Sequence, residues 1–192
     1  MSVNDSLKRR HELGLVERFF IPELRRRGIE LRNPRSGGLG EPDVVCDAAD
    51  GTRGVEVADA YMSAADATAL WGMVRTIARD GGIAPVVTST SDAPPGLTRM
   101  VVNPDARLAA ALQAALDEHC RRRYGMPTYL LLNASHAPLT SAADATALLP
   151  QLRLPDHGYE AVFLCLARNW SWERVFFEIA RLSYERLHLT AD

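Results

Sequence analysis

The sequence predicts an α/β domain whose mixed sheet is flanked by helices. Apolar residues recur at helical spacing over residues 5–27, which predicts a first helix. The dipeptide Asp50-Gly51 joins two runs rich in Val, as is typical of a β-hairpin. Two uninterrupted apolar runs, 128–133 and 161–166, have the length of buried strands. Since helical and strand segments alternate along 192 residues, one α/β domain accounts for the whole chain.

The N-terminal forty residues predict one helix, one strand and one loop. The helix begins near Asp5, is interrupted by Pro22 and ends at Gly28. Residues 29–32 then read as a short strand. Residues 33–40, with one Pro and three Gly, read as a mobile loop.

The rest of the chain continues the alternation. Strands over 42–48 and 53–60 form the hairpin, and Ser63 opens a helix that ends at Gly81-Gly82. Further elements are predicted as strands over 84–90 and 99–102, a helix from Asn103 to residues 121–123, and a short helix over 141–149. The segment 170–189 fits either a helix or a strand, and both remain open.

Composition excludes several classes of protein. The chain is 47% hydrophobic and 24% charged, which excludes general disorder. No run approaches the roughly 18 apolar residues of a membrane span, so no membrane association is expected. The N-terminus lacks an apolar signal-peptide core, and a cytoplasmic location is the default. Cys46, Cys120 and Cys165 share no ligand-like spacing, so the sequence indicates neither a disulfide framework nor a zinc site.

Charge is distributed unevenly. Residues 1–40 hold nine Lys or Arg against five Asp or Glu, whereas residues 41–70 hold one Arg against seven acids. A basic segment followed by an acidic one is compatible with a polyanion-binding surface beside a metal site, and equally with solvated helix faces. Lys8 is the only lysine among 22 basic residues.

The hairpin brings two acids together. With Asp50-Gly51 as the turn, Asp43 opposes Ala58, and Asp43 and Glu56 lie on one face as diagonal neighbours, about 6–8 Å apart at Cβ. Like charges at that distance repel, and a Mg²⁺ or Mn²⁺ ion with its preference for oxygen ligands would relieve the repulsion. The alternative is a solvent-facing edge on which both acids point into water.

Pro42-Asp43, followed by Glu56-Val57-Ala58 on the next strand, resembles the PD-(D/E)XK nuclease superfamily. The resemblance covers residues 5–135 and implies a restriction-endonuclease-like core: a helix, three antiparallel strands, a helix and a strand. Residues 136–192 would then be a C-terminal extension of a single domain, 1–192.

The resemblance also implies a site. Asp43, Glu56 and the backbone carbonyl of Val57 would be the metal ligands, with Mg²⁺ or Mn²⁺ as the cofactor. The acid that this superfamily carries on its first helix would be Glu17, with Glu12 as the second choice.

One position departs from the superfamily pattern, because Ala58 stands where a lysine is expected. That lysine would orient the attacking water or stabilise charge on the phosphate, which alanine cannot do. Lys8 is expected at the far end of the first helix. Arg75 is therefore the candidate substitute, because its guanidinium can bind a phosphate with two hydrogen bonds.

These observations favour a metal-dependent nuclease that cleaves nucleic acid through the Asp43–Glu56 pair. The alternative is a catalytically inactive nuclease-like module that binds nucleic acid or a protein partner, which Ala58 favours. The sequence leaves open DNA or RNA as substrate, homo-oligomerisation and the biological pathway.

Overall fold

A computed structural model describes residues 3–61, 104–134, 148–167 and 174–181. The N-terminal helical elements are α1 (Val3–Leu15), a π-helical turn η1 (Val16–Phe20) and α2 (Ile21–Arg26). The strands are β1 (Arg32–Ser36), β2 (Val44–Ala48), β3 (Gly51–Asp59), β4 (Thr128–Ala134), β5 (Ala161–Ala167) and β6 (Arg174–Arg181). Helix α4 (Pro104–His119) precedes β4, and a 3-10 turn, η3 (Leu149–Gln151), precedes β5.

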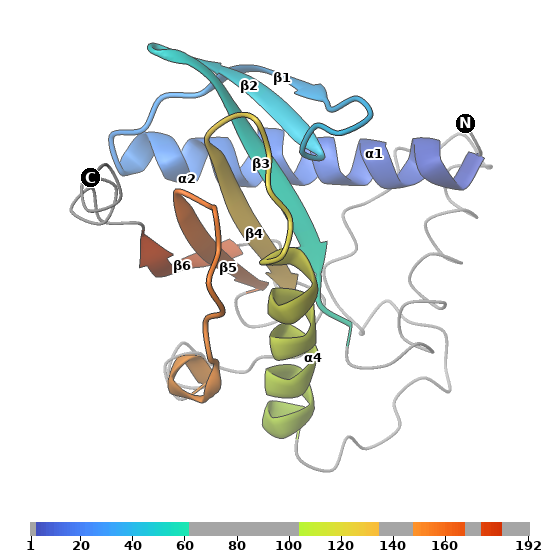
Figure 1. The fold of residues 1–192 in the computed structure, drawn as a ribbon, viewed down its shortest axis with the longest axis vertical. Coiled ribbons are helices and arrows are strands. Elements are labelled where there is room, and N and C mark those ends of the chain that lie inside the picture. Colours follow the sequence, from blue (N-terminus) through green and yellow to red (C-terminus); the bar gives the residue numbers. More distant parts are fainter. Residues whose placement is uncertain (1–2, 62–103, 135–147, 168–173, 182–192) are drawn as a thin grey trace, which may run out of the picture.

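The six strands form one mixed sheet in the order β1-β2-β3-β4-β5-β6. The first three strands are antiparallel neighbours, β3, β4 and β5 run parallel, and β6 returns antiparallel to β5. Helix α1 crosses one face of this sheet and α4 covers the other (Figure 1). The predicted α/β class with a mixed, helix-flanked sheet is confirmed, and the order of the first elements is the one that the resemblance implies.

Alternating side chains of the central strands pack into two separate cores. Leu130 and Leu132 of β4 join α4 residues such as Leu112 in one core. Tyr129 and Leu131 point the other way, into a core with the N-terminal helices. Since successive strand residues point to opposite faces, a continuous apolar run is what a strand covered on both sides requires.

The first helical rod changes its hydrogen bonding just before its proline. Ile21 N–H bonds to the carbonyl of Val16, five residues back, and Pro22 follows as the second residue of α2. Pro22 has no N–H to donate, so the widened turn absorbs the interruption that the sequence predicts. The rod ends at Gly28, which has a φ of 81°.

The first strand lies later than predicted. The strand predicted over 29–32 and the loop predicted over 33–40 are both wrong in part, because β1 occupies residues 32–36. Pro34, one of the residues that predict the loop, falls inside this strand. An edge strand accommodates Pro because one of its sides needs no ladder hydrogen bonds, and β1 pairs with β2 alone.

The hairpin register also differs from the prediction. The closing pair is Ala48 with Gly51, and Val44 pairs with Val55, so the turn is centred on Ala49 and Asp50 rather than on Asp50-Gly51. A tight turn centred on Asp50-Gly51 would need a positive φ at Asp50, whereas of this turn only Gly51 has one, at 133°. The shift is two residues, so each side chain keeps its predicted face.

Farther along the chain the described elements match the predictions. Helix α4, β4 and β5 are confirmed, and the open choice for the tail is settled as a strand over residues 174–181. The helix predicted from Ser63, the strands 84–90 and 99–102, and most of the helix 141–149 lie outside the described residues. No helix in the described part of the chain is long and apolar enough to cross a membrane.

Substituting Gly54 should test how tightly β3 fits its neighbours. A Cβ there would lie 2.4 Å from Pro42 Cγ and 2.7 Å from Thr128 Oγ1. We expect Gly54→Ala to lower the free energy of unfolding by about 2 kcal/mol, because the stiff proline ring must move. Gly125→Ala is the matched control, since a Cβ there meets no atom within 4 Å. Urea denaturation measures both variants. Equal losses of the free energy of unfolding in the two would contradict the expectation.

Candidate functional site

Glu56 is the most deeply buried acid of the hairpin. It lies in the middle of β3, only 1% exposed, on the face that α4 covers. The alternative in which the hairpin acids point into water is therefore wrong for Glu56. A buried carboxylate needs partners that compensate for its lost hydration.

Three side chains from the end of α4 and the following loop supply these partners. His119 Nδ1 lies 3.0 Å from Glu56 Oε1, and Arg122 Nη1 donates to the same oxygen. The Tyr124 hydroxyl donates to Oε2 at 2.5 Å. Burial alone would raise the pKa of Glu56, but these hydrogen bonds and the charge of Arg122 outweigh it and hold the pKa below its usual value. We call His119, Arg122 and Tyr124 the α4 clamp.

Asp43 immediately precedes the first residue of β2. Its Oδ2 accepts a hydrogen bond from Val57 N–H at 2.9 Å, and the register of the hairpin, continued by one residue, places it opposite Glu56. Burial raises the pKa of Asp43, and the charge of Glu56 raises it further, against the smaller effects of Lys8 and Arg122. Asp43 is thus within electrostatic reach of both helix layers.

Helix α1 adds a third acid and a lysine on adjacent turns. Glu12 is 2% exposed, and Lys8 Nζ lies 3.0 Å from its Oε1. Burial, then the charge of Asp43, raises the pKa of Glu12 to about 7, although Lys8 opposes the shift. Burial lowers the pKa of Lys8, but Glu12 and, more weakly, Asp43 and Asp59 raise it overall. The side chain of Lys8 remains 56% exposed, so its ammonium can reach a ligand.

The structure places the other predicted site residues differently. Glu17, the first choice for the helix acid, is exposed in η1, and Glu12 takes the position beside Asp43 instead. Lys8 lies toward the N-terminal end of α1, as predicted, yet it pairs with Glu12 and is within electrostatic reach of Asp43. Arg75 lies outside the described residues. Ala58 is 1% exposed and belongs to the core with α4, where a lysine would have to be buried.

The backbone of Val57 faces Asp43. Its N–H donates to Asp43, and since the N–H and C=O of one strand residue point to the same side, its carbonyl points past the start of β2 as well. The oxygen donors Asp43, Glu56 and Val57 are of the kind that Mg²⁺ and Mn²⁺ prefer. Within the described part of the chain, no three His, Cys, Asp or Glu side chains lie close enough together to hold a metal ion. These oxygen donors are of the type that the ion binds. In this structure, however, Glu56 is hydrogen-bonded to the α4 clamp.

A second polar cluster lies at the carboxyl end of β3. Asn133 Nδ2 donates to Asp59 Oδ1 at 2.6 Å, and the Tyr61 hydroxyl donates to Oδ2 at 3.0 Å. His11 Nε2 lies 3.8 Å from Asp59 Oδ1. Burial lowers the pKa of His11, but the bond and charge of Asp59 raise it overall. Asp59 is three residues from Glu56 along β3, so its side chain points to the other face of the sheet, where it meets His11 of α1.

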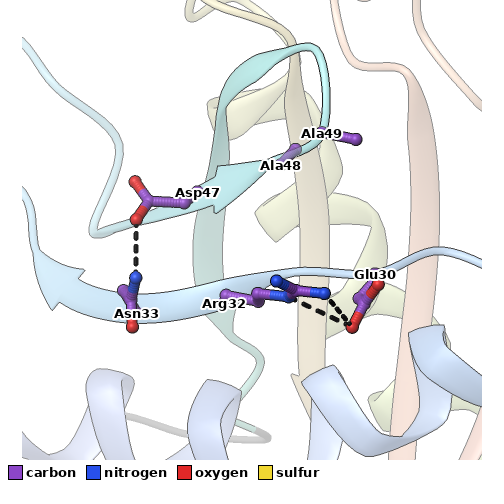
Figure 2. Close-up of a pocket in the computed structure, with 6 residues that line it drawn as sticks. All are labelled: Glu30, Arg32, Asn33, Asp47, Ala48 and Ala49. Atoms are coloured by element: carbon purple, nitrogen blue, oxygen red, sulfur yellow. Dashed lines mark hydrogen bonds and ion pairs between the residues drawn. The ribbon is translucent and has the colours of Figure 1, made fainter.

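A surface pocket lies at the opposite end of β2. It has a volume of about 290 Å³ and is lined by Glu30, Arg32, Asn33, Asp47, Ala48 and Ala49. Figure 2 shows that its polar side chains are turned toward one another: Asn33 donates to Asp47 at 2.8 Å, and Arg32 donates to Glu30. The lining carries two acids, Glu30 and Asp47, against one base, Arg32, and Asp43 is not part of it.

Sequence reasoning missed the α4 clamp and Lys8, although two spacings signalled them. Lys8 and Glu12 stand four residues apart and share one side of α1. His119 and Arg122 stand three apart around the turn that ends α4, where Arg122 N–H bonds to the His119 carbonyl. The clamp meets β3 only because the chain returns from α4 into β4, parallel to β3. Tyr159, which donates to the His119 carbonyl at 2.8 Å, fixes the end of α4 there.

The buried charge of Glu12 has a testable effect on stability. Its carboxyl has a pKa of about 7 when folded against 4.5 unfolded, so the folded state binds the proton more tightly. Stability therefore falls as pH rises between these values, and the full penalty applies above them. Without divalent cations we expect Glu12→Gln to be about 2 kcal/mol more stable than the wild type near pH 8, with no gain near pH 4. Glu17→Gln, at an exposed position, should change little at either pH.

Comparisons with known proteins add little to this description. No known protein family matches the sequence, and no curated protein matches it either. Among solved structures, SfsA of Pyrococcus furiosus in complex with Ca²⁺ is similar at a TM-score of 0.27 and 13% identity. The match covers 86% of this chain and 59% of SfsA.

Proposed function

We propose that this chain is a metal-dependent phosphodiesterase that acts on nucleic acid. The observation that carries the proposal is the burial of like charges beside one another. Glu12 lies on α1, Asp43 just before β2 and Glu56 on β3; the charge of Asp43 raises the pKa of Glu12, and that of Glu56 raises the pKa of Asp43. Burying two repelling carboxylates lowers stability, which a divalent cation bound between Asp43 and Glu56 would restore.

Asp43, Glu56 and the Val57 carbonyl would hold the ion, with Glu12 next to them. A bound Mg²⁺ or Mn²⁺ would supply Lewis-acid polarisation of the phosphate and a water of lowered pKa. Lys8 would place its ammonium on a phosphate oxygen and stabilise the charge that develops there. Lys8 thereby takes the part for which the sequence suggested Arg75.

The exposed side of α1 supports nucleic acid as the substrate. Arg9 and Arg10 are exposed beside Lys8, in the segment with the excess of positive charge. Arginine side chains on a helix surface supply the sequence-independent phosphate contacts of nucleic-acid binding. The basic surface thus lies on the same helix as the buried Glu12.

One observation favours the second candidate, a catalytically inactive nuclease-like module. All three members of the α4 clamp bond to Glu56, so in this arrangement its oxygens are already used. A module of this kind would bind nucleic acid through α1 without cutting it. The two candidates differ in whether a divalent metal ion leads to cleavage of the nucleic acid.

Incubation with single- and double-stranded DNA and RNA in Mn²⁺ or Mg²⁺ tests the proposal. We expect cleavage that stops when the metal is chelated and that is lost in Asp43→Asn, which keeps the acceptor for Val57 N–H. Binding of nucleic acid with no cleavage, equal in the wild type and Asp43→Asn and unaffected by metal, would support the inactive module and reject the enzyme.

A further inference from the structure

The α4 clamp occupies the carboxylate that the proposed ion needs. Oε1 of Glu56 meets both His119 and Arg122, and Oε2 meets Tyr124. Glu56 is only 1% exposed, and among the described residues these three side chains replace its lost water. A cation approaching Glu56 would also approach the guanidinium of Arg122, which repels it. The metal site and the clamp therefore compete for one side chain.

Arg122 is the member of the clamp that can leave. Its side chain is 41% exposed, whereas that of His119 is 13% exposed and lies at the end of α4, where Tyr159 fixes the backbone. Arg122 also contacts Glu118 on the helix surface at 3.3 Å. It therefore already has a position near solvent, while its planar guanidinium suits a phosphate as well as a carboxylate.

We propose that a phosphate of the nucleic acid takes Arg122 from Glu56 and so opens the site to the divalent cation. The exchange leaves every charged group with a partner of opposite charge, because phosphate replaces the carboxylate on Arg122 and the cation replaces Arg122 on the carboxylate. Arg122 is then a positioning residue that couples metal binding to substrate binding. The inference rests on the proposed function and adds its regulation: the ion binds tightly only when the substrate is present.

Mn²⁺ binding measured by calorimetry tests this coupling. The probe is a single-stranded DNA octamer whose phosphorothioate linkages resist cleavage, and an octamer with uncharged methylphosphonate linkages serves as its control. For the wild type we expect the charged octamer to tighten Mn²⁺ binding about tenfold or more, and the uncharged octamer to have no effect.

Arg122→Met should bind Mn²⁺ without any octamer about as tightly as the wild type binds it with the octamer. No further tightening is expected when the octamer is added. Arg121→Met is the matched control, because Arg121 is exposed and adjacent; it should behave as the wild type does. Tyr124→Phe, which removes one bond to Glu56 at nearly constant volume, should tighten Mn²⁺ binding in the same direction by a smaller factor.

The outcomes separate the two proposals. Suppose that Asp43→Asn abolishes Mn²⁺ binding, and that Arg122→Met has the same Mn²⁺ affinity as the wild type both with and without the octamer. The metal site then stands and the coupling is overturned. If none of the proteins binds Mn²⁺ even with the octamer, both the proposed function and the coupling are overturned. A wild type that binds Mn²⁺ equally tightly with either octamer or none also overturns the coupling.

Discussion

Lys8→Met should lower metal-dependent cleavage about 100-fold, the effect of removing one charged group that stabilises a transition state. The structure places this ammonium 3.0 Å from Glu12 and within electrostatic reach of Asp43, with more than half of its side chain exposed. The loss should appear in kcat, because the proposed contact strengthens as charge develops on the phosphate. Mn²⁺ affinity in the presence of nucleic acid should change little.

Arg9→Met is the control for general loss of positive charge. Arg9 is exposed, and adjacent helical residues point about 100° apart, so it does not share the side on which Lys8 meets Glu12. We expect Arg9→Met to raise KM modestly and to leave kcat unchanged. Lys8→Arg, which keeps the charge, should retain part of the activity. Equal losses of kcat in Lys8→Met and Arg9→Met would show that Lys8 contributes only to binding.

The fold could be predicted wherever the pattern depended on local spacing. Helix α4 and strands β4 and β5 follow from apolar periodicity and from runs such as 128–133, because both are properties of a short window. The hairpin was predicted at the right place and with the right faces. Its register was not, because the choice between turns at Ala49-Asp50 and Asp50-Gly51 depends on the φ that Asp50 adopts.

The candidate site was predictable only in part, because it joins elements distant in sequence. Asp43 and Glu56 belong to one hairpin, so their pairing could be derived from the turn. Glu12 and Lys8 reach them through the packing of α1 on the sheet, and Arg122 reaches Glu56 across 66 residues. No periodicity within a single element records such a contact. The choice of Glu17 over Glu12 failed for the same reason. Which acid of the first helix lies near Asp43 depends on how that helix packs against the sheet.

The largest effect on stability is expected at Glu56. Glu56→Ala leaves His119, Arg122 and Tyr124 without their shared acceptor and opens a cavity under α4. Removing one partner of a buried ion pair costs about 3–5 kcal/mol, and because Arg122 keeps part of its hydration we expect about 3 kcal/mol here. Urea denaturation near neutral pH, without divalent cations, measures the loss.

The pH dependence identifies the source of that loss. Because the folded pKa of Glu56 lies below its usual value, the stability it contributes is present above the unfolded pKa, near 4.5, and disappears as pH falls through the folded value. The difference in the free energy of unfolding between Glu56→Gln and the wild type should therefore shrink in acid.

Asp43→Asn should change the free energy of unfolding in the opposite direction under the same metal-free conditions. It keeps the bond to Val57 N–H and removes a repulsion with Glu56, so it should be as stable as the wild type or more stable. If both substitutions lowered stability equally, the two acids would be ordinary structural partners and the argument for a cation between them would fail. Opposite signs would show that the fold stabilises one acid of the pair through the α4 clamp and leaves the other to be compensated from outside the chain.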